Sequence, residues 1–114
     1  MIVSEIKEAI VSGENINRQD KNGMTPLMCA VDYEELQLVT ELIDLHAKLD
    51  LQDKFGQTAL MLAAGRNFTE AVKLLLSAKA NLKCVSASGL TALGFAKDNG
   101  NTGSYDILKR AGAK

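Results

Sequence analysis

The chain has 114 residues, 46% of them hydrophobic, and thirteen Lys and Arg against fourteen Asp and Glu give a formal net charge of −1. This length suits a single domain, and the composition is that of an ordinary globular protein rather than a disordered one. The balanced charge gives no sign of the strongly basic surface of a nucleic-acid-binding domain, which would have to arise by clustering in three dimensions. The apolar runs fall far short of the roughly 20 residues that span a membrane.

Residues 1–19 predict one amphipathic helix followed by a turn. Ser12-Gly13-Glu14-Asn15 closes this segment, and its apolar residues recur at helical spacing: Val3, Ile6, Ala9 and Ile10. Charged residues interrupt any hydrophobic stretch of the kind that a signal peptide needs. With Cys29 and Cys84 expected as reduced thiols, we predict a cytoplasmic protein. Met1 is either the native start or the point where a longer protein was cut.

One string of eight residues occurs three times, beginning at positions 23, 56 and 89. The copies are Gly23-Met24-Thr25-Pro26-Leu27-Met28-Cys29-Ala30, Gly56-Gln57-Thr58-Ala59-Leu60-Met61-Leu62-Ala63 and Gly89-Leu90-Thr91-Ala92-Leu93-Gly94-Phe95-Ala96. A constant spacing of 33 residues is typical of repeat arrays, in which each unit buries its apolar face by stacking on its neighbours. We therefore expect a single domain, 1–114, divided into a half-unit 1–19 and units 20–52, 53–85 and 86–114.

Two short helices are predicted in each unit. The threonine after the glycine turn can cap the first helix, expected at Ala59–Gly65 in the middle unit. In the first unit Pro26 occupies the first helical position, where proline loses no hydrogen bond. Second helices are expected over Glu34–Leu45 and Thr69–Ala78, because their apolar residues recur at helical spacing. Acidic residues at the start of the Glu34–Leu45 helix would suit its dipole.

These patterns resemble the ankyrin-repeat family. The segment Thr25-Pro26-Leu27-Met28-Cys29-Ala30 is similar to the family's Thr-Pro-Leu-His-x-Ala core. Likewise Val72-Lys73-Leu74-Leu75-Leu76 with Ala80-Asn81 is similar to its Val-x-x-Leu-Leu followed by Gly-Ala. The resemblance covers essentially the entire chain. It implies an all-α solenoid of stacked helix-turn-helix units that are joined by β-hairpin loops.

Two departures from the family pattern lead to structural expectations. The family's histidine is replaced by Met28, Met61 and Gly94, and we expect the two methionines to fill the core as flexible side chains. His46 and Lys79 stand where the last unit has a glycine, so each is expected to end its helix in the left-handed conformation. A non-glycine residue there costs on the order of 1 kcal/mol.

The residues that could carry chemistry do not form a convincing site. His46 is the only histidine and lacks an accompanying nucleophile, whereas catalysis of that kind needs both. The acidic cluster of Asp32, Glu34 and Glu35 lacks a glycine-punctuated loop of oxygen ligands. Gly100-Asn101-Thr102-Gly103 lacks the strand and the lysine of a phosphate-binding loop, so it predicts an interhelical turn. We expect no catalytic residue, no metal site and no cofactor, and hence no enzyme.

The resemblance implies a partner surface on the concave side of the array, made of the hairpin tips and the exposed ends of the first helices. Met24, Phe55 and Leu90 place apolar side chains at the tips, and Tyr33 and Arg66 are residue types enriched in binding hot spots. Carried over position by position, the expected contact residues are Lys21, Asn22, Met24, Tyr33, Lys54, Phe55, Gln57, Arg66 and Leu90.

The sequence therefore predicts a non-enzymatic, monomeric protein–protein interaction module, or scaffold, that binds another protein and neither nucleic acid nor membrane. Binding through the convex helices stays open beside binding through the concave face. The alternative is a regulatory or targeting segment of a larger multidomain protein whose activity lies outside this chain. The boundaries of the gene or transcript would discriminate between the two.

Overall fold

The computed structural model describes residues 1–13 and 15–114, so Glu14, within the predicted closing turn, lies outside the described residues. The regular secondary structure of the described residues consists of helices, without a strand, which confirms the all-α expectation. Its helices are α1 (Val3–Ser12), α2 (Pro26–Asp32), α3 (Leu36–Asp44), α4 (Ala59–Gly65), α5 (Thr69–Ser77), α6 (Ala92–Asp98) and α7 (Thr102–Arg110).

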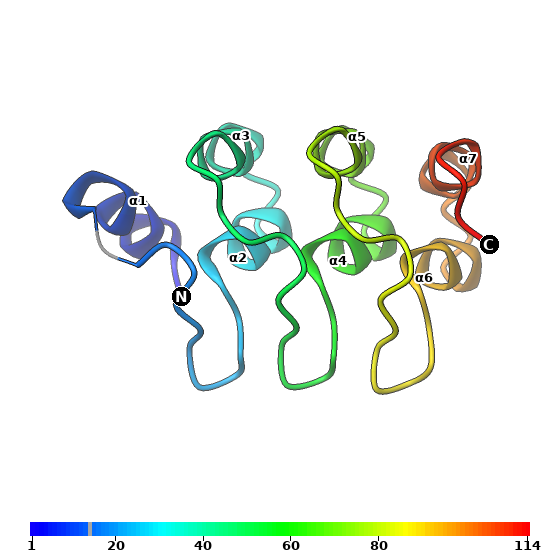
Figure 1. Cartoon of the computed structure of the whole chain (residues 1–114), viewed down its shortest axis with the longest axis horizontal. Helices are drawn as coiled ribbons and strands as arrows, with labels where there is room; N and C mark the ends of the chain where they lie inside the picture. Colours follow the sequence, from blue (N-terminus) through cyan, green and yellow to red (C-terminus); the bar gives the residue numbers. More distant parts are fainter. Residues whose placement is uncertain (14) are drawn as a thin grey trace.

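The helices form two layers that run along an array measuring 39 × 24 × 20 Å (Figure 1). The first helices of the units, α2, α4 and α6, make one layer, and the second helices, α3, α5 and α7, make the other. Helix α1 stands beside α2 and α3 at the N-terminal end. Each helix pair is joined by a tight turn, and a long loop leads from the second helix of one unit to the first helix of the next.

Threonine caps determine where the first helices begin. Each threonine hydroxyl accepts a hydrogen bond from the amide three residues further on, at 3.1 Å for Thr25 and 3.3 Å for Thr58 and Thr91. Such a bond satisfies one of the backbone N–H groups that a helix start leaves free. Pro26 lies at the start of α2, and α4 spans Ala59–Gly65, both as the sequence predicts.

The start of the second helix in the first unit differs from the prediction. Helix α3 begins at Leu36 rather than at Glu34, and Glu35 precedes it without a side-chain capping bond. Glu34 itself has φ = 56°, so it lies in the turn between the helices and not in the first turn of α3. The expected support of the helix dipole by these acids is therefore wrong. In the next unit, α5 ends within one residue of its predicted boundary.

The predicted interhelical turn of the last unit is confirmed only at its start. Gly100 makes the turn with φ = 68°, but Thr102 and Gly103 already belong to α7. Glu34 and Asn67 adopt the same left-handed conformation at the equivalent positions of the preceding units. These two turns could not be predicted, because neither position has a glycine to indicate a positive φ.

At the ends of the second helices the left-handed prediction holds. His46 has φ = 63° and Lys79 has φ = 74°, where the last unit has Gly112 with φ = 100°. The amides of His46 and Lys79 donate to the carbonyl oxygens of Ile43 and Leu76, as expected where a left-handed residue ends a helix.

The core lies between the two helix layers and continues from unit to unit. Met28 and Met61 are almost completely buried, which confirms that they fill the core in place of the family's histidine. Small residues on the first helices are equally buried and allow neighbouring units to pack closely. The residues with no measurable exposure include Ile6, Ala30, Val31, Val39, Leu42, Ala63, Ala64, Ala71, Val72, Leu75, Ala96 and Leu108.

Candidate partner-binding surface

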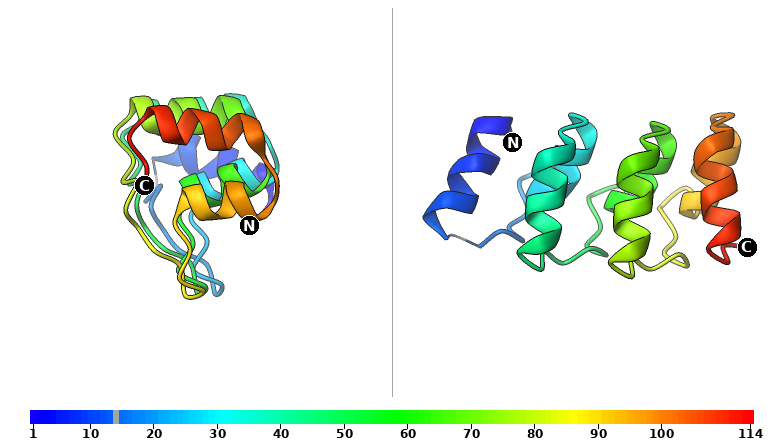
Figure 2. Two further views of the ribbon diagram at one scale, coloured as in Figure 1. Left: turned by 90° about the vertical axis from the view of Figure 1, so that its right-hand side faces the viewer. Right: turned by 90° about the horizontal axis from the view of Figure 1, so that it is seen from above.

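Three loops project from the first-helix layer and stack along the array (Figure 1). Seen along the array, loops and helices form an L, whose inner corner is bounded by the loop tips and the first helices (Figure 2, left). We call this side the concave face. Each loop closes with a hairpin-type backbone bond, for example from the Asp20 amide to the Met24 carbonyl at 3.0 Å. The loops are thus hairpins in their bonding, although they are too short to form strands.

A carboxylate at the base of each of the first two loops holds the turn closed. Oδ1 of Asp20 accepts hydrogen bonds from the amides of Asn22 and Met24, both at 2.9 Å. Oδ1 of Asp53 accepts from the amides of Phe55 and Gln57 at 2.9 and 2.8 Å. Aspartate side chains commonly stabilise turns in this way. The tip side chains are therefore presented on a fixed backbone.

Glycine is required at the tips for two reasons. Gly23 has φ = 77° and Gly56 has φ = 73°, a conformation that other residues adopt only with strain. A Cβ on Gly23 would also lie 2.9 Å from Cα of Asp53, and one on Gly56 would lie 2.8 Å from the Ala87 nitrogen. The repeated glycine thus permits successive loops to approach closely.

Hydrogen bonds join neighbouring loops directly. The Lys54 amide donates to the Asn22 carbonyl, and the Ala87 amide donates to the Phe55 carbonyl, both at 2.9 Å. The Gln52 side chain donates to the Gly56 carbonyl in its own loop at 2.8 Å and to the Val85 carbonyl of the next at 3.0 Å. Every loop of the array is therefore bonded to its neighbour by both backbone and side chain.

The predicted contact residues differ in how far they are exposed. Phe55 is 55% exposed and Tyr33 is 48% exposed, whereas Met24 and Leu90 are half-buried, so these two tips offer less apolar surface than Phe55. Among the remaining predicted residues, Lys21, Lys54 and Arg66 are exposed and Asn22 and Gln57 are half-buried. No partner is present, so their role stays a prediction.

The stacked, 33-residue architecture agrees with a comparison against known families. The family model for ankyrin repeats matches residues 28–114 in three copies. The chain belongs to the ankyrin-repeat family. Ankyrin repeats generally serve as protein–protein interaction modules and are generally not catalytic. A comparison with curated proteins gives no match.

The predicted ankyrin contact residues Arg66 and Tyr33 are held by intramolecular contacts. Nε of Arg66 donates to Oδ1 of Asp32 at 2.9 Å, across the ends of α2 and α4. The Tyr33 hydroxyl donates to the Met1 carbonyl at 2.9 Å. A partner that uses either side chain must therefore add to these contacts or replace them.

A pair of glutamines that was not predicted as functional helps to align the ankyrin loops. Gln19 donates to the Gly23 carbonyl and to the Gln52 carbonyl, both at 2.9 Å, and Gln52 repeats this pattern one unit later. Their spacing of 33 residues is a signal that could have identified them. Val85 occupies the equivalent position before the last loop, and its side chain cannot make these bonds.

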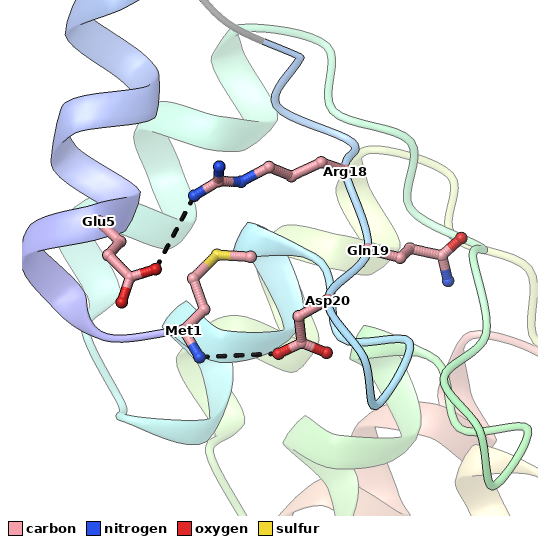
Figure 3. Close-up of a pocket in the computed structure, with 5 residues that line it drawn as sticks. All are labelled: Met1, Glu5, Arg18, Gln19 and Asp20. Carbon is pink, nitrogen blue, oxygen red and sulfur yellow. Dashed lines mark ion pairs between the residues drawn. The ribbon is translucent and has the colours of Figure 1, made fainter.

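A hollow at the N-terminal end of the ankyrin array is lined by charged side chains that already interact (Figure 3). The Met1 ammonium lies 3.6 Å from Oδ2 of Asp20, and Arg18 lies 4.0 Å from Glu5. Burial on its own raises the pKa of the Asp20 carboxyl, but the Met24 and Asn22 amides and the ammonium together lower that pKa below its usual value. The two ion pairs leave this hollow with little charge to offer a ligand.

In the described part of the chain, no three side chains of the metal-ligating types lie together, and no helix is both long and apolar enough to cross a membrane. Both cysteines are free. Burial raises the pKa of the Cys29 thiol to about 11, so this side chain is a poor nucleophile.

Proposed function

We propose that this ankyrin array binds another protein through its concave face and acts as a monomeric, non-enzymatic scaffold. The hairpin tips and the ends of the first helices would supply the contacts. The residues concerned are Lys21, Asn22, Met24, Tyr33, Lys54, Phe55, Gln57, Arg66 and Leu90. The proposed division of the array is the half-repeat 1–19 and the repeats 20–52, 53–85 and 86–114.

The exposure of Phe55 carries this proposal. A large aromatic side chain is 55% exposed at the middle tip, while its backbone is bonded within its own loop and to the next one. Rigid aromatic side chains near the centre of a surface are the residues that most often dominate binding energy. Because the tip is already ordered, little conformational entropy is lost when a partner covers it.

A cytoplasmic location belongs to the same proposal. It is supported by the free thiols of Cys29 and Cys84, since reducing compartments keep cysteines unpaired.

The experiment is affinity capture with matched baits. The full chain, Phe55→Ala, Arg66→Ala and Leu45→Ala are immobilised and exposed to the same cell lysate. Leu45 is the control, because it is apolar and 48% exposed but lies at the end of α3 in the second-helix layer. A partner retained by the full chain and by Leu45→Ala, but lost from the other two, supports the concave face.

The opposite pattern of binding would contradict the concave face as the binding surface. A partner lost from Leu45→Ala and kept by Phe55→Ala would place binding on the convex helices. Thermal denaturation of each bait checks folding, and we expect Phe55→Ala to keep its Tm because most of that side chain is in solvent. Determining the full transcript separately tests the alternative that this array is a regulatory or targeting segment of a larger protein.

A further inference from the structure

Two lysines occupy the same position on successive hairpin tips. Lys21 and Lys54 lie 33 residues apart, and both are exposed. Among the described residues neither of them lies within ion-pair distance of a carboxylate, whereas Arg66 on the same face is neutralised by Asp32. The tips of the first two loops therefore carry positive charge that no carboxylate of the described residues neutralises.

The acids nearest to these lysines in sequence are directed into their own turns. Asp20 and Asp53 each use Oδ1 to accept two backbone amides, which stabilises the turn. Hydrogen bonds to a carboxylate favour its charged form and offset part of its negative charge locally. These aspartates fix the backbone of the tips and leave the ammonium groups to face a partner.

Lys54 is held in place more firmly than an ordinary surface lysine. Its Nζ lies 3.0 Å from Oδ1 of Asn22 in the neighbouring loop and 5.1 Å from the centre of the Phe55 ring. An ammonium has three donors, so the bond to Asn22 leaves two for another acceptor. Holding a long side chain in position beforehand reduces the entropy that binding must overcome.

We propose that the partner segment recognised by the concave face is an acidic peptide segment. One of its carboxylates pairs with Lys54, Lys21 attracts further acidic side chains, and an adjacent apolar side chain packs on the exposed part of Phe55. This inference rests on the proposed function and adds the chemistry of the partner. Cations at the edge of an interface accelerate association with an oppositely charged partner and select against like-charged ones.

A nucleic acid also offers anions and flat rings to a lysine beside an aromatic side chain. The acidic peptide is favoured here because the chain as a whole is slightly negative and Glu34 and Glu35 are exposed between the end of α2 and the start of α3. A polyanion that follows the array would meet these charges, whereas a short segment confined to the tips would not.

The test selects ligands without knowledge of the natural partner. The full chain is immobilised and used to select binders from random linear peptides displayed on phage. The peptides recovered are synthesised, and their affinities are measured by fluorescence polarisation against the parent, Lys54→Glu, Phe55→Ala, Arg66→Ala and Lys73→Glu. Lys73→Glu is the matched control, since it makes the same charge change at an exposed site on α5.

We expect the selected peptides to be rich in Asp or Glu beside an apolar residue. Lys54→Glu should weaken their binding by about tenfold or more, Lys73→Glu should change it by less than about twofold, and added salt should weaken it. The proposal of an acidic partner is wrong if the peptides lose affinity for Phe55→Ala but contain no acidic residue, or if they bind Lys54→Glu as tightly as the parent. Binding through the concave face would still be supported in that case.

Other results would be equally decisive. If the peptides bind Phe55→Ala, Arg66→Ala and Lys54→Glu as tightly as they bind the parent, binding through the concave face itself is contradicted. A library that yields no binder would overturn the inference, as would a dT oligonucleotide that binds more tightly than any selected peptide. Circular dichroism of every variant ensures that a loss of binding is not a loss of folding.

Discussion

Arg66 donates from Nε to Oδ1 of Asp32 at 2.9 Å and thereby joins the ends of two successive first helices, α2 and α4. Both side chains remain well exposed, at 45% and 38%. Exposed pairs of this kind contribute about 0–1 kcal/mol, because water and salt screen the charges. The pair therefore orients Arg66 on the concave face more than it stabilises the fold.

Arg66→Ala should accordingly lower the free energy of unfolding by less than about 1 kcal/mol. Urea denaturation of the parent, Arg66→Ala, Asp32→Ala and the double variant gives the coupling between the two side chains. A coupling of several kcal/mol would mean that the pair is a structural element of the array. Partner affinity, by contrast, should fall more in Arg66→Ala than in Asp32→Ala.

Removing the cap of α4 should destabilise the whole array. Thr58 is almost fully buried, and its hydroxyl accepts from the Met61 amide while its own amide donates to Sδ of Met61 at 3.5 Å. Thr58→Ala should lose about 1 kcal/mol of unfolding free energy, measured by chemical denaturation. Thr58→Ser keeps the hydroxyl and should recover part of the loss. Equal losses in both variants would indicate that packing of the threonine methyl, not capping, is responsible.

Glycine at the left-handed end of α5 should stabilise the protein. Lys79 has φ = 74°, and Lys79→Gly should relieve backbone strain of about 1 kcal/mol, offset in part by the greater freedom of glycine in the unfolded chain. The matched control is Lys73→Gly within α5, where the same change should cost about 1 kcal/mol. The expected result is a pair of shifts in Tm with opposite signs. A decrease in both would contradict the strain at Lys79.

Stability should decline above pH 9 through Cys29. Burial raises the pKa of this thiol from its ordinary value of 9.0 to about 11, and the side chain is only 4% exposed. The folded state thus keeps a proton that the unfolded chain releases, so this contribution is complete below pH 9 and decreases as the pH rises towards 11.

Urea denaturation between pH 8 and about pH 11 measures this effect. Cys29→Ala should flatten the decline relative to the parent, and groups that titrate in both proteins cancel in the comparison. Cys84→Ala is a second test and should flatten the decline as well, because burial and then the Asp50 charge also raise the pKa of the half-buried Cys84 thiol. Parallel curves for the parent and Cys29→Ala would show that the thiol ionises equally well in the folded state.

Local chemistry in the sequence was sufficient to predict the repeat and the starts of the first helices α2 and α4. A threonine cap acts over three residues, and Pro26 acts at its own position, so neither depends on distant parts of the chain. The left-handed ends at His46 and Lys79 could be predicted because a glycine marks the same position in the last unit. The family resemblance added the stacked architecture that these signals only imply.

The tertiary structure decided what the sequence leaves open. Glu34 and Asn67 turn the chain between helices without any glycine, and Met24 is more buried than a tip residue was expected to be. Above all, Lys54 meets Asn22 only because one loop stacks on the next. Each of these outcomes depends on contacts between units, which exist only once the units are in register. Local chemistry therefore determines where each threonine-capped first helix begins, whereas stacking determines which side chains remain available to bind.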